Sequence, residues 1–259
     1  MDLLHRLTSI VAAAFVISLL SVSLSGCADS KYAMQEGDLA QRFVPSERHI
    51  DYPPDSLVGL TLHEEEEQMK LKLSVPYEDL HLRWSSSHRN SSGRRSELRS
   101  LTYATFWSLE LSLASLEPEL GVSLLTKDKA REFISTRREE YETSIQIDVF
   151  WFGAPSESAV AGPGTFIRLR DAQGTTYAPT HRDYGPPREA FARAGQTALY
   201  RRNTFVFPRH VDGEDILANT DEMYLLVSPN GAATTFRFTW SWDASSAPVA
   251  DRERTRSLR

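Results

Sequence analysis

The sequence predicts a mainly β protein, namely an antiparallel β-sandwich with one amphipathic α-helix. Short segments in which apolar and polar residues alternate recur along the chain, and turn-forming residues separate them. Only one segment has the spacing of a helix, whereas a parallel α/β fold needs several helices. No internal repeat of about 20–50 residues is visible, and no pair of cysteines marks an immunoglobulin topology.

Residues 1–26 are predicted to form a signal peptide. An apolar run from Thr8 to Leu20 is shorter than the ~20 residues that a membrane-spanning helix needs. The motif Leu-Ser-Gly-Cys follows at Leu24–Cys27. It resembles the lipobox of bacterial lipoproteins. This resemblance implies that Cys27 receives a diacylglyceryl group and becomes the first residue of the mature chain.

The resemblance also implies a location and a first partner. Two or three acyl chains anchor a protein stably where one is marginal, so the expected partner is the lipid bilayer, contacted through acylated Cys27. In enteric bacteria, an aspartate directly after the lipidated cysteine resembles a retention signal for the inner membrane. Ala28 holds that position here and Asp29 follows it. The outer membrane is therefore favoured over the inner membrane within the cell envelope.

Composition restricts the other partners. Cys27 is the only cysteine, so the mature domain gains no disulfide in an oxidising compartment and must rely on an apolar core. The net charge of −6 argues against nucleic acid as a partner. No cofactor is expected, since Pro163 interrupts the one glycine-rich loop that could cradle a phosphate.

The first mature segments are predicted to lie outside the main body. Residues 27–56 are interpreted as the lipidated cysteine and a tether, because prolines interrupt them and no apolar period is sustained. Residues 57–100 are interpreted as an N-terminal hairpin and an Arg/Ser-rich loop. The hairpin is indicated by Leu71 and Leu73, which alternate with polar residues.

The β-sandwich body is expected at residues 101–243. Apolar side chains of one parity from Leu101 to Leu113 predict a long, half-buried strand. Thr126 then resembles a helix N-cap, and residues 127–142 predict the amphipathic helix. Its inner face consists of Ala130, Phe133, Ile134, Arg137 and Tyr141.

Further strands are predicted after the helix. Their cores are Ile145–Trp151, Phe166–Arg170, Thr175–Ala178, Leu199–Phe207, Met223–Val227 and Thr234–Trp242. Asp171–Gly174 is a predicted hairpin turn, residues 179–195 a long excursion, and residues 244–259 a disordered tail. The order of elements over residues 101–243 resembles that of bacterial lipoproteins of uncharacterised function with an immunoglobulin-like body, a resemblance that implies no activity.

Aromatic residues concentrate on one parity of the last strand. They are Phe236, Phe238, Trp240 and Trp242. Such a stripe is more often core than surface, and we interpret it as core. The alternative is an exposed platform on which sugar rings or a partner protein stack.

No constellation of residues predicts catalysis, and we expect a protein that is not an enzyme. His63 begins a sequence like that of a zinc-protease helix, but Glu67 stands where the second histidine is needed. No Gly-x-Ser-x-Gly elbow and no Ser-x-x-Lys pair is present. A fold could still assemble His181, Asp183 and His210 into a site.

An acidic loop is the weak candidate for a metal site. Its carboxylates, which could bind calcium, are those of Asp212, Glu214, Asp215 and Asp221. Their spacing differs from that of an EF-hand, and Asp-Gly is common turn chemistry. The leading expectation is a non-catalytic envelope lipoprotein that binds or scaffolds another envelope component, such as a protein. A glycan- or calcium-binding module is the alternative, followed by an envelope hydrolase.

Overall fold

The computed structural model describes residues 32, 44–89, 101–153, 162–193, 196–228 and 235–243. All of them belong to one compact unit, Tyr32–Arg259. The described residues are mainly β, as the sequence predicts, and every strand pair is antiparallel except one. The lipobox and the predicted tail after Asp243 lie outside the described residues.

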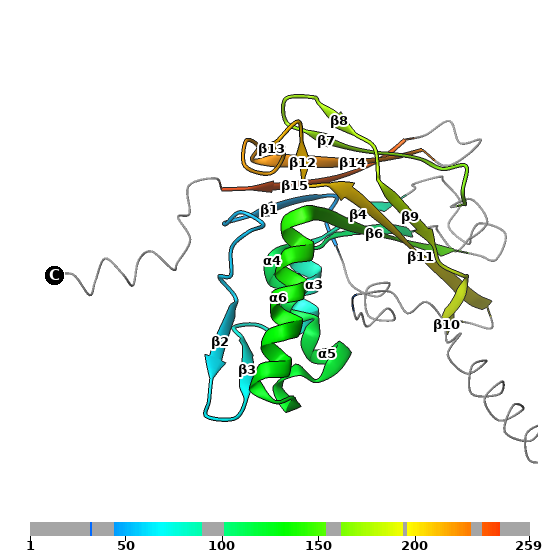
Figure 1. Cartoon of the computed structure of the whole chain (residues 1–259). Helices are drawn as coiled ribbons and strands as arrows, with labels where there is room; N and C mark the ends of the chain where they lie inside the picture. The colour runs from blue at the N-terminus through cyan, green and yellow to red at the C-terminus, as the bar shows by residue number, and fades with distance from the viewer. Residues whose placement is uncertain are drawn as a thin grey trace, which may run out of the picture. The chain divides into compact units, whose positions relative to one another are not determined.

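One sheet has five strands and contains most of the C-terminal chain (Figure 1). In spatial order the strands are β1 (Glu47–Ile50), β15 (Phe236–Trp242), β14 (Glu222–Ser228), β7 (Phe166–Asp171) and β8 (Thr176–Tyr177). β1 and β15 form the parallel pair. The predicted hairpin turn joins β7 to β8, and Gly174 supplies the positive φ of 93° that this turn requires.

The second sheet has six strands. In spatial order they are β10 (Arg188–Arg193), β11 (Gln196–Pro208), β6 (Ser144–Gly153), β5 (Leu101–Phe106) and β4 (Ser85–Arg89), with β9 (His181–Tyr184) also paired to β11. Side chains of both sheets meet in one core. The rings of Phe106 and Trp240, for example, lie 5.8 Å apart.

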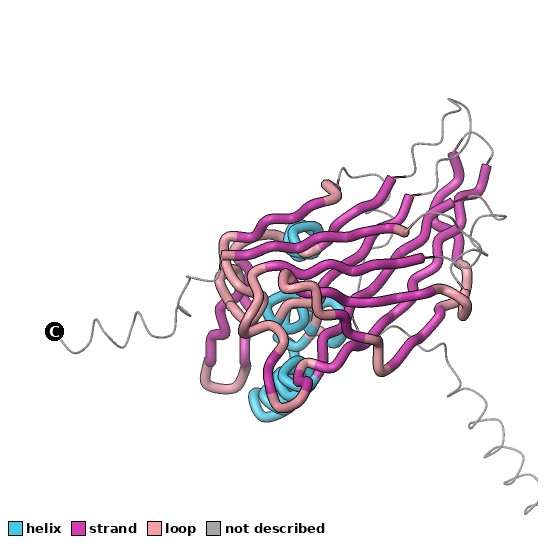
Figure 2. Tube along the Cα trace, turned by 90° about the horizontal axis from the view of Figure 1, so that it is seen from above, coloured by secondary structure: helices cyan, strands magenta, loops and turns pink. Residues whose placement is uncertain are grey.

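Helices cover the far side of the six-stranded sheet, beneath the strands in Figures 1 and 2. They are α3 (Tyr77–Arg83), α4 (Leu109–Ala114), α5 (Leu116–Leu120), the 3₁₀ turn η1 (Val122–Leu124) and α6 (Lys127–Thr143). Two small hairpins complete the described elements: β2 (Leu60–Glu64) with β3 (Met69–Leu73), and β12 (His210–Val211) with β13 (Glu214–Asp215).

Two local predictions are confirmed. The predicted helix is α6, which begins after Thr126 and buries Ala130, Ile134, Arg137 and Tyr141. The Thr126 side chain makes no capping hydrogen bond, however. The aromatic stripe of β15 is buried in the core, and Trp240 Nε1 donates to the carbonyl oxygen of Trp84 at 2.9 Å.

The long strand expected from Leu101 to Leu113 is wrong in its second half. β5 ends at Phe106, and Ser108 begins α4 by accepting a hydrogen bond from the backbone N–H of Leu111 at 3.2 Å. The alternation from Leu109 to Leu113 indicated a strand because a short, completely buried helix leaves no polar face by which it could be distinguished. Even Glu110 is buried, and burial raises the pKa of its carboxyl above the usual value.

The expected tether to residue 56 is also corrected. Residues 44–56 belong to the folded body, since Ile50 of β1 pairs with Trp242 of β15. Tyr32 is 3% exposed, and its ring stacks on that of Trp107 with a centroid separation of 4.1 Å. The pairing partners lie about 190 positions away in the sequence, so no local pattern could indicate them.

Three other short strands replace predicted loops. A single helix was predicted, but the described residues contain three further α-helices, α3, α4 and α5. β4 occupies the start of the Arg/Ser-rich loop, while β9 and β10 occupy the predicted excursion. β4 and β9 are polar and pair with longer strands, so tertiary contacts override weak local propensity there. No helix of the described residues has the length and apolar character needed to cross a bilayer.

Candidate functional site

The acidic loop does not assemble into a ligand set for calcium. Asp215 accepts hydrogen bonds from Arg209 at 2.8 and 2.7 Å and from the backbone N–H of Leu217 at 2.9 Å. Partial burial raises the pKa of Asp215, but these hydrogen bonds more than offset it, so the pKa lies below its usual value. Asp212, Glu214 and Asp221 form no group of metal-ligating atoms with it.

The three residues proposed as a distant site are not brought together either. His181 and Asp183 lie on β9 and are exposed, whereas His210 lies on β12. In the described part of the chain, the one cluster of three such groups is exposed and consists of His49, Asp51 and Asp243. Sequence analysis missed it because Asp243 follows β15 while His49 lies on β1, so the parallel pairing of these strands joins residues from opposite ends of the body.

The best candidate surface is the outer face of the five-stranded sheet. Alternation along each strand sends one set of side chains into the core and the other set outward. Strand register then aligns the outward set in rows: Arg168, Leu226 and Arg237 form one row across β7, β14 and β15. Arg170 and Tyr224 lie side by side in the next row.

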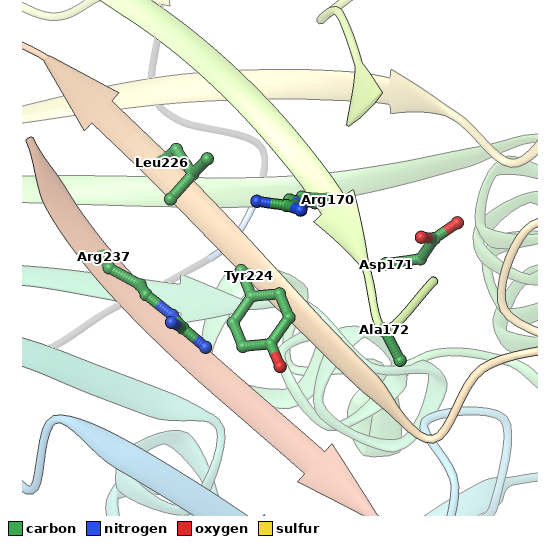
Figure 3. Close-up of a pocket in the computed structure, with 6 residues that line it drawn as sticks. All are labelled: Arg170, Asp171, Ala172, Tyr224, Leu226 and Arg237. Carbon is green, nitrogen blue, oxygen red and sulfur yellow. The ribbon is translucent and has the colours of Figure 1, made fainter. Parts of the chain in front are cut away.

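A shallow pocket of about 210 Å³ lies on this face. It is lined by Arg170, Asp171, Ala172, Tyr224, Leu226 and Arg237. Figure 3 shows Arg170, Tyr224, Leu226 and Arg237 on three neighbouring strands. We call these four residues together with Arg168 the arginine face.

Aromatic rings hold two of the three guanidinium groups. The guanidinium carbon of Arg237 lies 3.8 Å from the ring centroid of Tyr224, and that of Arg168 lies 4.4 Å from the ring centroid of Phe166. The Tyr224 hydroxyl donates to Glu222, and this hydrogen bond is the main reason that the pKa of Tyr224 is raised.

The guanidinium groups of the arginine face have no carboxylate partner among the described residues. Asp171 is adjacent to Arg170 in the sequence but turns the other way. Its carboxylate accepts from the backbone N–H of Thr175 at 2.8 Å and from the hydroxyl of Tyr177 at 2.7 Å. Arg168 donates one N–H to the carbonyl oxygen of Ile167 at 2.8 Å. The face thus offers N–H donors that no carboxylate of the described residues accepts, and a local positive charge in a chain whose net charge is −6.

A second polar cluster lies on the helix side of the six-stranded sheet. Unlike the arginine face, it is buried and its polar groups bond to one another. Asp148 is completely buried and accepts from Trp107 Nε1 at 2.9 Å, from Thr204 Oγ1 at 2.8 Å and from Arg202 at 3.0 and 2.5 Å. His81 lies near this cluster, and its Nε2 is 3.2 Å from Thr105 Oγ1. Desolvation, followed by the nearby Arg202, lowers the pKa of His81 to about 3. The donors of the cluster are used inside the protein, so its role is structural.

Comparison with known proteins found no similar family model, no similar curated protein and no similar solved structure. Alternation along β15 separates Arg237 from the aromatic stripe, but the sequence did not indicate the arginine face. The parity of each strand was visible in the sequence, whereas the order in which β7, β14 and β15 lie side by side was not.

Proposed function

We propose that the protein is a cell-envelope lipoprotein that is anchored in the bilayer through acylated Cys27 and binds or scaffolds another envelope component without catalysing a reaction. The observation that carries this proposal is the motif at Leu24–Cys27, which follows an apolar run of signal-peptide length. Ala28 after the cysteine favours the outer membrane, and the expected partner besides the bilayer is another component of the envelope.

The arginine face supports a binding role. It combines exposed cations with a shallow pocket on the rigid face of a sheet, which is a scaffold that holds side chains in place. Buried polar groups such as Asp148 and Arg202 are engaged in hydrogen bonds within the protein, which favours a structural role for them over a catalytic one. A glycan-binding module is the second candidate, and the same surface favours it. Calcium binding has no comparable support, since Asp215 is paired with Arg209.

The anchor is tested by replacing Cys27 with serine in the producing bacterium. Cys27 is the only cysteine, so no other thiol can accept the diacylglyceryl group. We expect Cys27→Ser to abolish incorporation of labelled fatty acid and to leave the precursor uncut, as measured by autoradiography and the mass of the chain. Ser30→Ala, three positions later, is the matched control and should be labelled and processed normally. Labelled, shortened Cys27→Ser protein would refute the anchor.

A further inference from the structure

The arginine face gathers like charges that no carboxylate of the described residues neutralises, although Arg168 donates a hydrogen bond to the carbonyl oxygen of Ile167 at 2.8 Å. Arg168 and Arg237 occupy the two ends of one cross-strand row with Leu226 between them. Like charges placed close together on a sheet face are destabilising. Arg170, on the next outward position of β7, adds a third cation to the same side. Such clustering is explained by an anionic ligand that bridges the guanidinium groups.

Contacts with aromatic rings prepare two of the cations for binding. Because Arg237 lies over Tyr224 and Arg168 over Phe166, these guanidinium groups already occupy restricted positions. Tyr224 is itself fixed by its hydrogen bond to Glu222. Binding at Arg237 therefore costs less side-chain entropy than binding at a freely moving arginine would, and the same holds for Arg168.

The backbone of this surface excludes one common mode of peptide recognition. β14 pairs with β7 on one side and with β15 on the other, so its N–H and C=O groups are already bonded within the sheet. An extended peptide cannot add to it as another strand. Over β14, a ligand of the pocket must therefore be recognised by side chains.

The pocket combines cationic forks with an apolar patch in a small volume. Arg170 and Arg237 supply N–H donors that fit carboxylate or phosphate oxygens. Leu226 lies on β14, between β7 and β15, and offers an apolar surface. The pocket has a volume of about 210 Å³, which suits a single sugar ring better than a longer ligand. We propose that the arginine face binds an acidic saccharide, that is, a sugar carrying a carboxylate or a phosphate, with its oxyanion on Arg170 and Arg237 and its ring over Leu226.

This inference rests on the proposed function for the source of its ligand, because a lipid-anchored protein meets the sugars of the cell envelope. The chemistry of recognition does not depend on the anchor. The acylation of Cys27 and the binding of saccharide can therefore be measured separately, and either one can fail without the other.

The test measures binding of the full-length protein, purified from membranes in detergent, to four immobilised polymers. Polygalacturonate carries carboxylates on sugar rings, phosphomannan carries phosphates on sugar rings, dextran is a neutral glycan, and polyglutamate is an acidic chain without sugar. We expect binding to one or both acidic glycans, weaker binding at high salt, and little binding to dextran. Polygalacturonate and phosphomannan distinguish the two anions.

Variants locate the binding to the arginine face. Arg170→Gln and Arg237→Gln should each weaken binding to the acidic glycan by about tenfold or more, because each removes a charge-assisted contact. Arg182→Gln removes the same charge from exposed β9 of the other sheet and should leave binding unchanged. All three variants should keep the unfolding midpoint of the parent protein, which separates a binding effect from misfolding.

Three other outcomes overturn the proposal. Equal binding to polyglutamate would assign the face to acidic peptides, and equal binding to dextran would remove the role of the arginines. Equal losses in Arg170→Gln and Arg182→Gln would reduce the effect to net charge. Acidic-glycan binding by a protein that is not acylated at Cys27 would refute the proposed anchor and leave this inference intact.

Discussion

The arginines of the two sheets differ in what they face. Beneath the six-stranded sheet, Arg202 is about 10% exposed and its guanidinium lies 2.5 Å from a carboxylate oxygen of the completely buried Asp148. On the outer face of the five-stranded sheet, Arg170 and Arg237 are exposed and meet no carboxylate of the described residues. The same residue type therefore stabilises the fold in one place and is available to a ligand in the other.

Burial explains this difference. A charge removed from water must be paired and hydrogen-bonded. Among the described residues, the two buried arginines, Arg137 and Arg209, each have a carboxylate partner. Arg137 has Glu119 at 2.8 Å, and Arg209 has Asp55 and Asp215 at 2.8 and 2.7 Å. An exposed guanidinium remains hydrated and needs no partner for stability. The cluster of exposed arginines on the arginine face is therefore the observation from which we propose binding.

The largest expected effect follows from breaking the buried pair. Asp148→Ala leaves Arg202 buried without its counter-charge, which typically costs about 3–5 kcal/mol in free energy of unfolding. Asp183→Ala on exposed β9 is the matched control and should cost less than about 0.5 kcal/mol, as should Arg170→Gln on the arginine face. Denaturant titration measures all three. A loss of less than about 1 kcal/mol for Asp148→Ala would contradict a structural role for the buried cluster.

A smaller, pH-dependent effect is expected from His81. Desolvation, and then Arg202, depress its pKa to about 3 in the folded state, although Asp148 acts in the opposite direction. Below the ordinary histidine pKa of about 6.5, His81 binds a proton in the unfolded chain but stays neutral in the folded chain. The free energy of unfolding is therefore highest above pH 6.5 and falls as the pH approaches 3.

The slope from this one group is at most about 1.4 kcal/mol per pH unit. We therefore expect the stability of His81→Gln to depend less on pH than that of the parent protein between about pH 5 and 6.5, where most carboxylates are already ionised. His63→Gln, which replaces an exposed histidine of β2, serves as the control. If the free energy of unfolding depended on pH equally in His81→Gln and the parent protein, His81 would take up its proton in the folded state as it does in the unfolded chain, and the prediction would be wrong.

Local periodicity made part of the fold predictable. Helix α6 and the buried stripe that contains Trp240 were readable because the signal lies within one element. Ser108 was misread, since a short buried helix after a strand continues the same alternation. β1 was missed because its partner strand comes from the other end of the chain.

The candidate site was predictable only in its components. The outward parity of Arg170 and Arg237 follows from alternation along their strands. Their proximity depends on β14 pairing between them, and this is a property of topology that no spacing in the sequence encodes. The acidic loop failed as a metal site for the converse reason: its clear sequence signal, Asp215, is paired with Arg209 in the fold.

The most direct test of the account places a photo-crosslinking amino acid at Leu226, in the centre of the arginine face, in the intact bacterium. Leu124 in η1 provides the control, since its side chain is 84% exposed on a different part of the body. Adducts are identified by mass spectrometry after purification of the crosslinked protein. We expect a saccharide-containing adduct from position 226 that is absent from position 124 and is lost when Arg170→Gln and Arg237→Gln are combined. No adduct at position 226, or the same adduct at both positions, would contradict the account.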